Sequence, residues 1–371
     1  MGFDKHWQRI NQLDKVIDLG LDDKSIKDFG KVGSLSGLLK NMRNLSLEGN
    51  LIRSWEQVVH LGTELTLLNK LYLSFMKLDL PENLYEMTEF QTYNDVNEII
   101  TVNEKTTVFQ NLKTLVLIGM DLTWEKINRF AQFFPNVEEL VLCQNKCNDF
   151  ENISKETIDA FKNIHYLNLD GNEIVSSNFT DQVSEVKQES HKLELLANFA
   201  KLKNLTMNNN HITRFESAKE LLNLEILSIE QNGIKSGEIL VDLSKCIRLY
   251  YLRILKNPIS DIHSVRHVRN IAVGEIRTLI SVNGTDLSKY DRKDFEFYYL
   301  NASFKEYFDL FNTSHEEYLE CEFLKWVINI HPNVLPLLGL YDNPYPQIKD
   351  RQVLQENSMN VPIIQKQEFI S

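Results

Sequence analysis

One eleven-residue pattern recurs along most of this chain. Residues 137–147 read VEELVLCQNKC, with apolar side chains at the first, fourth, sixth and last positions and an asparagine third from the end. The same spacing returns in stretches that start at Val16, Met42, Leu68, Leu112, Ile164, Leu202, Leu224 and Leu249, and a last strand and turn are expected in the stretch that starts at Ile276. One copy occurs by chance in many helices, but six copies carry the asparagine in the same slot: Asn50, Asn145, Asn172, Asn210, Asn232 and Asn257.

This pattern, LxxLxLxxNxL, is the unit of leucine-rich repeats. Its centre forms a short parallel strand whose leucines point inward, and the asparagine amide bonds backbone groups of the following turn. One unit cannot bury its apolar edge alone, so units stack and the ends need caps. We therefore expect an α/β leucine-rich-repeat solenoid, with a curved parallel sheet on the concave side, helices on the convex side, and a cap at each end.

The spacing of the repeats predicts the domain organisation. Between the repeats that start at Leu68 and Leu112, and again after the repeat that starts at Ile164, the step is too long for one unit, which predicts inserts. Trp7, Ile10 and Leu13 share one helical edge that could cover the first repeat. The predicted segments are an N-terminal cap at 1–15, repeats at 16–275 with inserts near 79–111 and 175–201, a C-terminal cap at 276–330 and a linker or tail at 331–371.

Helices are expected on the outer side of the repeats. Ser54 and Thr123 each precede a short helical pattern and can accept a hydrogen bond from its first turn. Trp55 and Trp124 follow them at equivalent places, and we expect both indoles to be packed in the core between helix and strand.

Charge and cysteine content exclude several classes of protein. The formal net charge of −12 argues against nucleic acid and against an anionic membrane as general partners. No run approaches the ~18 apolar residues that a membrane span requires, and the N-terminus has no apolar signal-peptide segment. The four cysteines form no disulfide framework, and Cys147 occupies an inward slot of its repeat. We expect a reduced, cytoplasmic protein.

No catalytic motif is found. There is no phosphate-binding loop, no nucleophile elbow and no Cys-x-x-Cys pair. His263 and His267 are four residues apart, but a zinc site needs further ligands, and Arg266 and Arg269 lie beside them. We therefore expect a protein that is not an enzyme, with no catalytic residue, no cofactor and no metal site.

The residues that flank the inward leucines should line the concave sheet. In the middle repeats several of them are apolar, and an exposed apolar patch with polar flanks is typical of a protein-binding site. The predicted partner-binding residues are Glu48, Tyr72, Val116, Ile118, Val141, Cys143, Asp170, Asn208, Glu230 and Arg253. The alternative is that an insert folds over this patch. If the patch is open, Val116→Asp together with Val141→Asp should leave the fold intact and weaken binding.

The chain resembles the tubulin-binding cofactor E family in its central leucine-rich-repeat domain. The resemblance is carried, in this order, by LSLEGNLIRSWEQV at 45–58, LKTLVLIGMDLTWE at 112–125, PNVEEL at 135–140, the Asp291-Arg-Lys cap and His331-Pro332. It implies a chaperone of the cytoplasm and cytoskeleton that binds α-tubulin and other tubulin-folding cofactors and helps to assemble or dissociate the αβ-tubulin heterodimer. Such proteins also carry a CAP-Gly domain before the repeats and a ubiquitin-like domain after them, and neither stretch is found in this sequence.

A different class of function stays open. Leucine-rich-repeat proteins also serve as adaptors in signalling or in ribonucleoprotein assembly. Solenoids of the phosphatase-regulatory type have nearly uniform repeats, and the two inserts favour the tubulin-folding hypothesis over that one.

Overall fold

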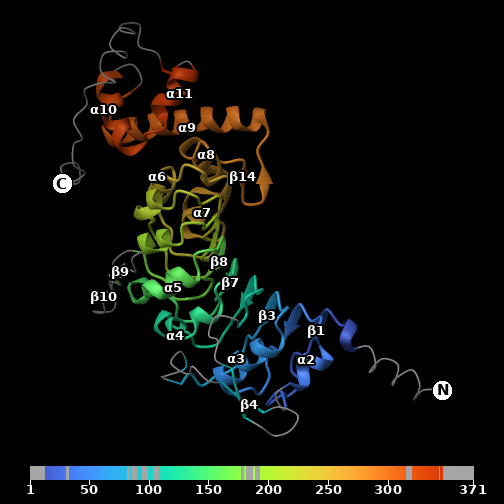
Figure 1. Cartoon of the computed structure of the whole chain (residues 1–371). Coiled ribbons are helices and arrows are strands. Elements are labelled where there is room, and N and C mark those ends of the chain that lie inside the picture. The colour runs from blue at the N-terminus through green and yellow to red at the C-terminus, as the bar shows by residue number, and fades with distance from the viewer. Residues whose placement is uncertain are drawn as a thin grey trace. The chain divides into compact units, whose positions relative to one another are not determined.

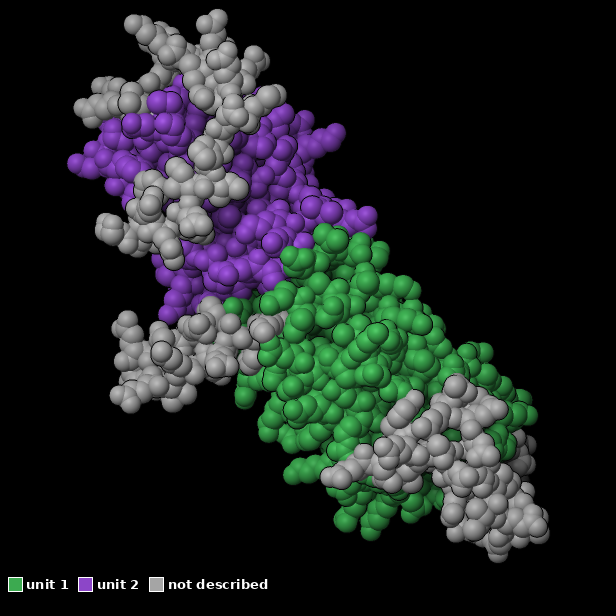
Figure 2. All heavy atoms as spheres, turned by 60° about the vertical axis from the view of Figure 1, so that its left-hand side comes forward, with its two compact units in different colours: residues 1–212, 220–232 green, residues 213–219, 233–371 purple. Residues whose placement is uncertain are grey.

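The computed structural model describes most of the repeat region and the C-terminal helices. The described residues are 13–30, 33–81, 84, 90–93, 99–102, 108–176, 179–180, 187–188, 193–314, 320–341 and 343–345. The chain divides into two compact units, coloured separately in Figure 2. Unit 1 comprises residues 1–212 and 220–232, and unit 2 comprises residues 213–219 and 233–371. Each unit is described by itself.

Unit 1 contains a sheet of short parallel strands, one for each repeat. In spatial order they are β1 (Asp18–Gly20), β2 (Asn44–Ser46), β3 (Lys70–Tyr72), β6 (Thr114–Val116), β7 (Glu139–Val141), β8 (Tyr166–Asn168), β11 (Asn204–Thr206) and β12 (Ile226–Ser228). The first strand leucines pair in register across the whole sheet, from Leu19 with Leu45 to Leu205 with Leu227. The predicted leucine-rich-repeat fold is confirmed.

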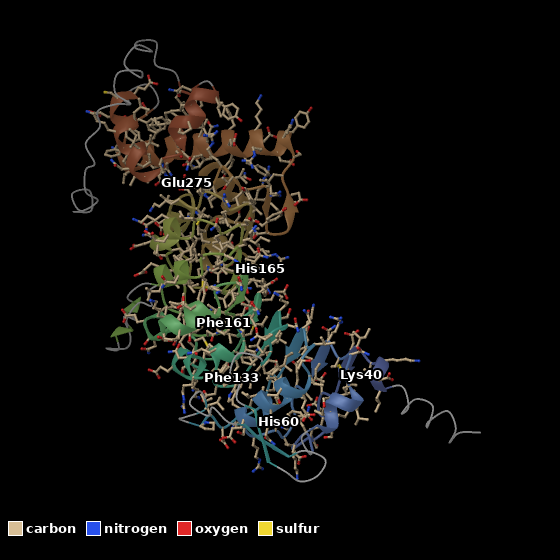
Figure 3. The ribbon with its side chains drawn as sticks, viewed as in Figure 1. Lys40, His60, Phe133, Phe161, His165 and Glu275 are labelled. Atoms are coloured by element: carbon tan, nitrogen blue, oxygen red, sulfur yellow. The ribbon has the colours of Figure 1, made fainter. Side chains whose placement is uncertain are left out.

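Short helices and 3₁₀ turns connect these strands. They are η1 (Leu13–Lys15), α2 (Ser34–Leu38), α3 (Trp55–Glu64), α4 (Trp124–Asn128), η2 (Ala131–Phe133), η3 (Phe150–Asn152), α5 (Lys155–Ala160) and η4 (Leu193–Asn198), followed by η5 (Glu216–Glu220). In Figure 1, α4 and α5 lie on one side of β7 and β8. Phe133 and Phe161, labelled in Figure 3, are buried within this part of unit 1.

Both expected helix starts are present. The Ser54 side chain accepts a hydrogen bond from the Glu56 backbone N–H as part of a capping box, and Thr123 accepts one from Lys126. Each cap satisfies a backbone donor that a helix end otherwise leaves unpaired. Trp55 and Trp124 are each 1% exposed, which confirms that both indoles belong to the core.

The repeated asparagines form a ladder between neighbouring repeats. The Asn145 Oδ1 accepts hydrogen bonds from the backbone N–H groups of Met120 and Leu122, both at 3.0 Å, and its Nδ2 donates to Leu117 O at 2.7 Å. Asn210 makes the same set of bonds to the repeat before it. These amides are buried, so each one satisfies backbone groups that have no access to water.

Both predicted inserts contain a small antiparallel pair of strands. The first holds β4 (Phe90–Tyr93) paired with β5 (Ile99–Val102), and the second holds β9 (Phe179–Thr180) paired with β10 (Lys187–Gln188). The remaining insert residues lie largely outside the described part of the chain. The same is true of Trp7 and Ile10 in the predicted N-terminal cap.

Unit 2 begins with repeat-like elements and ends in helices. Its elements after η5 are α6 (Glu238–Leu243), β13 (Tyr251–Arg253), α7 (Pro258–His263), α8 (Val265–Glu275), β14 (Ser281–Val282), β15 (Thr285–Asp286), α9 (Lys289–Leu310), α10 (Glu320–Ile330) and α11 (Val334–Leu340). Figure 1 shows α9 as a long helix beside the shorter α10 and α11.

The last strand sits three residues later than the sequence pattern suggests. Leu252 pairs with Val282, so the final unit starts at Leu279 and the expected start at Ile276 is wrong. Ile276 is instead the residue that ends α8. Asn283 and Gly284, both with positive φ, then reverse the chain into β15, which pairs antiparallel with β14.

A helical cap closes unit 2. The buried side chains of α9, α10 and α11 form one aromatic and aliphatic cluster: Tyr299, Leu300, Phe304, Tyr307, Phe323, Val327, Val334 and Leu337. The sequence reading of residues 334–340 as linker is wrong, because they form α11 and contribute to this cluster. Pro336 does not break α11, because it stands in the first turn of this helix, where its missing N–H has no intrahelical partner to lose.

His331 joins three parts of the cap. Its Nδ1 lies 3.3 Å from Oε1 of Glu275, and its Nε2 lies 3.0 Å from Oε2 of Glu306. Glu275, labelled in Figure 3, is 1% exposed and also accepts a hydrogen bond from the Tyr299 hydroxyl at 2.7 Å. Burial alone lowers the pKa of His331, but the bonds to Glu275 and Glu306 and their negative charges outweigh burial and raise this pKa to about 9.

This arrangement predicts a loss of stability in alkali. Because the pKa of His331 is raised by folding, its charged form stabilises the cap fully below the unfolded value of ~6.5, and this contribution disappears as pH rises through the folded value. We expect the His331 contribution to the free energy of unfolding to fall by about 3 kcal/mol between pH 6 and pH 10. Urea unfolding of the native protein and of His331→Gln at both pH values measures it. Equal pH dependence in the two proteins contradicts the assignment.

Candidate functional site

The predicted partner-binding residues of unit 1 share one face of its sheet. Residues in the middle of each strand stand opposite one another in consecutive repeats, and the register runs Gly20, Ser46, Tyr72, Val116, Val141, Asn168, Thr206, Ser228. The residues two places further on follow the same order: Asp22, Glu48, Ser74, Ile118, Cys143, Asp170, Asn208 and Glu230. Arg253 lies on β13 in unit 2 and is exposed.

The middle of this face is less open than the sequence suggests. Val116 is only 7% exposed, whereas Tyr72, Ile118, Val141 and Cys143 are half-buried. Val116 is therefore a core residue, since the side chains on both neighbouring strands are large and apolar. The expectation that Val116→Asp leaves the fold intact is wrong, because a buried carboxylate without a partner costs several kcal/mol.

Cys143 contributes to this face as a small apolar group. Burial, together with the negative charge of Asp170, raises the pKa of its thiol to about 11. The thiol therefore stays protonated near neutral pH and is a poor nucleophile and metal ligand. The buried Cys147 thiol behaves in the same way, because burial raises its pKa further still.

Polar side chains bond to one another along the later repeats of the face. Asp170 accepts hydrogen bonds from the backbone N–H and the Nδ2 of Asn208, at 2.7 and 3.2 Å. Asn208 Oδ1 in turn accepts from the Ser228 hydroxyl at 2.8 Å and from the Glu230 backbone N–H at 2.7 Å. These bonds fix the side chains of Asp170 and Asn208 in one orientation before any partner arrives.

A third column of residues belongs to the same face. Side chains alternate along a strand, so the residue before the first strand leucine points to the same side as the middle one. The members in register are Asp18, Asn44, Lys70, Thr114, Glu139, Tyr166, Asn204 and Ile226. The sequence analysis missed this column, although the two-residue alternation around each leucine was the signal that could have found it.

Sequence reasoning also missed Phe75. Each repeat of unit 1 turns, just before its asparagine slot, on a residue with positive φ: Asp23, Gly49, Phe75, Gly119, Gln144, Gly171, Asn209 and Gln231. Glycine adopts this conformation without strain, whereas for a bulky side chain it is uncommon. Phe75 nevertheless has a φ of 60° and leaves 57% of its surface exposed. The glycines in this slot at 49, 119 and 171 were the signal for the turn.

A shallow hollow of about 560 Å³ lies at the edge where the strands of unit 1 begin. Its lining includes His165, labelled in Figure 3, together with Lys201 and Lys203. Lys201 Nζ bonds Asn163 Oδ1 at 2.7 Å, and Lys203 Nζ pairs with Glu225 at 2.8 Å. The two lysines therefore already have partners within their own unit.

Within the described ranges, no group of three or more His, Cys, Asp or Glu side chains could hold a metal ion. None of the helices in this part of the chain is long and apolar enough to cross a membrane. The four cysteines are free thiols.

The stacked parallel strands and the asparagine ladder define a leucine-rich-repeat protein whose sheet face is its candidate binding surface. The resemblance to cofactor E is confirmed by curated relatives. Tubulin-specific chaperone E of Xenopus laevis is 24% identical over 352 residues, which are 93% of this chain and 60% of the relative. Tubulin-folding cofactor E of Arabidopsis thaliana is 25% identical over 301 residues, or 81% of this chain and 52% of the relative.

A third relative, the tubulin-specific chaperone cofactor E-like protein of Rattus norvegicus, is 23% identical over 287 residues, or 76% of this chain and 60% of the relative. The chain thus spans about half to three fifths of the length of these relatives. No family model matches the chain. Among solved structures, an internalin of Listeria monocytogenes is 17% identical and covers 73% of this chain and 81% of its own, with a TM-score of 0.35. The assignment to the leucine-rich-repeat class therefore rests on the stacked parallel strands and the asparagine ladder.

Proposed function

We propose that this chain is a tubulin-folding cofactor that acts in the cytoplasm, in association with the cytoskeleton, by binding rather than by catalysis. The observation that carries the proposal is the similarity over 93% of the chain to a protein named tubulin-specific chaperone E. Its substrate would be α-tubulin, and other tubulin-folding cofactors would be its partners in assembling or dissociating the αβ-tubulin heterodimer.

The sheet face of unit 1 is the surface proposed for this contact. It presents half-buried apolar side chains at its centre, from Tyr72 on β3 to Val141 on β7, with polar side chains on both flanks. Apolar centres with polar rims are typical of protein interfaces. The face is also rigid, since the amide ladder behind it and the bonds of Asp170 hold it in place. A rigid face loses little conformational entropy on binding.

The test is retention of purified tubulin on the immobilised protein. Val141→Asp places a carboxylate in the centre of the face, and we expect it to lower the affinity at least about tenfold. Leu222→Asp is the matched control, because Leu222 is 59% exposed and lies outside the sheet face. Thermal unfolding of both variants checks that each remains folded. Failure of the native protein to retain tubulin contradicts the function, and equal retention by both variants contradicts the surface.

A further inference from the structure

The sheet face of unit 1 carries strong negative charge. Counting the three outward columns and the turn position with positive φ, its acidic residues are Asp18, Asp22, Asp23, Glu48, Glu139, Asp170 and Glu230, whereas Lys70 is its one basic residue. The whole chain has 40 basic and 52 acidic residues, so a face this poor in lysine and arginine is far from the average composition.

Four of the seven acids on this face accept hydrogen bonds from neutral donors, Asp170 among them. Asp18 accepts from Asn44, Asp22 accepts from the Ser46 hydroxyl, and Glu139 accepts from the Thr114 hydroxyl at 2.9 Å. The ion pairs found in the described part of the chain include none of the seven acids.

Two lysines near the face are paired with acids outside it. Lys113 pairs with Glu138 at 2.7 Å and Lys146 with Asp121 at 2.6 Å, and these pairs lie at the two edges of the sheet. These two lysines therefore do not neutralise the acids of the face.

Phe75 adds a fixed apolar anchor at the carboxyl end of β3. Its backbone N–H donates to Ile118 O at 2.8 Å, which holds the residue in the ladder. Its ring lies over Gly119, where an added Cβ would come within 2.9 Å of the ring Cδ1. A residue larger than glycine at position 119 would therefore collide with the Phe75 ring. Phe75 is 57% exposed, and the position of its ring over Gly119 keeps the ring from folding onto the core.

The charge and the apolar anchor are arranged in a row. Glu48 follows β2 and Asp170 follows β8, and β3, β6 and β7 lie between them. Four strand spacings of ~4.8 Å separate the two acids by roughly 19 Å. Between them in the same column, Ile118 and Cys143 are half-buried, with Phe75 beside them. Ser74 is fully buried, and its hydroxyl accepts a hydrogen bond from the Ile118 backbone N–H at 3.2 Å. The accessible part of the row therefore runs from an acid through apolar side chains to a second acid.

We infer that the sheet face of unit 1 binds a partner segment with basic residues at both ends and apolar residues between them, and that Phe75 is the aromatic residue on which the apolar part packs. Lysine or arginine at the ends would meet Glu48 and Asp170, and charge complementarity of this kind sets orientation and excludes acidic competitors. About six extended residues at ~3.3 Å each span the distance. The proposed function supplies the identity of the partner, tubulin or another cofactor, and this inference supplies the chemistry of the bound segment.

The first test uses synthetic peptides. A fluorescein-labelled peptide with two lysines at each end and four leucines between them is titrated with the full chain, and fluorescence anisotropy reports binding. Peptides with glutamate for lysine, or serine for leucine, are the controls. We expect only the lysine and leucine peptide to bind, and its dissociation constant to rise about tenfold between 50 and 300 mM NaCl. Equal binding of the glutamate peptide, or no binding of the lysine peptide, overturns the inference.

Variants locate the site. Glu48→Gln with Asp170→Asn removes the two charges at the ends of the row, and Phe75→Ala removes the anchor. Each variant should raise the dissociation constant of the lysine and leucine peptide about five- to tenfold. Glu125→Gln with Asp159→Asn removes two exposed charges from α4 and α5 and is the matched control, which should bind as the native protein does. Phe75→Leu should recover part of the affinity. Equal affinity of the face and control variants overturns the placement.

Purified tubulin, used as a second probe on the same variants, separates the two proposals. If tubulin binds and the face variants weaken it in a salt-dependent way, both are supported. If tubulin binds with no effect of Phe75→Ala or of the charge variants, this inference is overturned and the proposed function stands. If tubulin does not bind but the peptide does, the proposed function is overturned and the chemistry of the face stands.

Discussion

Gly274→Ala is expected to be among the most damaging single substitutions in the chain, lowering the free energy of unfolding of unit 2 by about 3 kcal/mol. Gly274 lies on α8, where a Cβ would overlap the Cβ and Cγ of Tyr299 on α9. Tyr299 has no room to retreat, since it is fully buried and its hydroxyl is bonded to Glu275. The two helices must therefore move apart, which opens the cluster that holds α10 and α11 in place.

Urea unfolding followed by circular dichroism measures this effect. Gly237→Ala is the matched control, because no atom lies within 4 Å of an added Cβ at that glycine and its φ of −67° suits alanine. It should change the free energy of unfolding by less than about 1 kcal/mol. Tyr299→Ala, combined with Gly274→Ala, should cost less than the sum of the two single changes, because it removes the overlap. Strict additivity would argue against steric conflict as the cause.

Asp242→Ala is expected to destabilise unit 2 by about 3 kcal/mol, because it leaves a partly buried arginine without its main partner. Asp242 binds Arg214 through two bonds, Nε to Oδ2 at 2.9 Å and Nη2 to Oδ1 at 3.2 Å, and it also accepts from the Phe215 backbone N–H at 3.3 Å. The Asp242 side chain is 3% exposed. Burial alone raises the pKa of Asp242, but the guanidinium of Arg214 outweighs burial and lowers this pKa.

The sign of the pH dependence follows from that lowered pKa. A carboxyl whose pKa falls on folding stabilises the protein above its unfolded pKa, and the contribution is lost as pH falls through the folded value. The loss of stability caused by Asp242→Ala should therefore be largest at pH 7 and become smaller in strong acid. Glu238→Gln is the control, since Glu238 contacts the same Arg214 but its side chain is 55% exposed, and it should cost less than about 1 kcal/mol. If both variants lose the same stability, the buried pair is not the cause.

The repeat architecture could be predicted because its pattern is local and repeated. Leucines two apart fix the register of every strand, and an asparagine amide in a dry turn has few alternatives to bonding backbone groups. The helix starts at Ser54 and Thr123 were predictable for the same reason, since a cap needs only neighbouring residues. The start of the last repeat was predicted wrongly, because Ile276 and Leu279 both fit the pattern and only the pairing of β14 with β13 decides between them.

The exposure of the candidate site was harder to predict. Val116 is placed correctly on the outward side, yet Tyr72 and Val141 on the adjacent strands bury it, and that depends on the sizes of neighbours distant in sequence. Phe75 escaped notice because the pattern assigns its slot no role. The Phe75 ring is exposed because of its turn conformation and because Gly119, in the next repeat, leaves room for it. The sequence of one repeat does not contain both features.

The amide link between Asn172 and Asn210 has a consequence for how this chain can evolve. The Asn210 side chain reaches back to Asn172 and Ile174, so the stack is sealed directly across the second insert. These bonds use no atom of residues 177–192, whereas Leu193, Leu196 and Phe199, which also lie between the two repeats, are buried in the core. Lineages can therefore lengthen, shorten or rewrite residues 177–192, and so acquire or discard binding partners, while the amide link between the two repeats is kept.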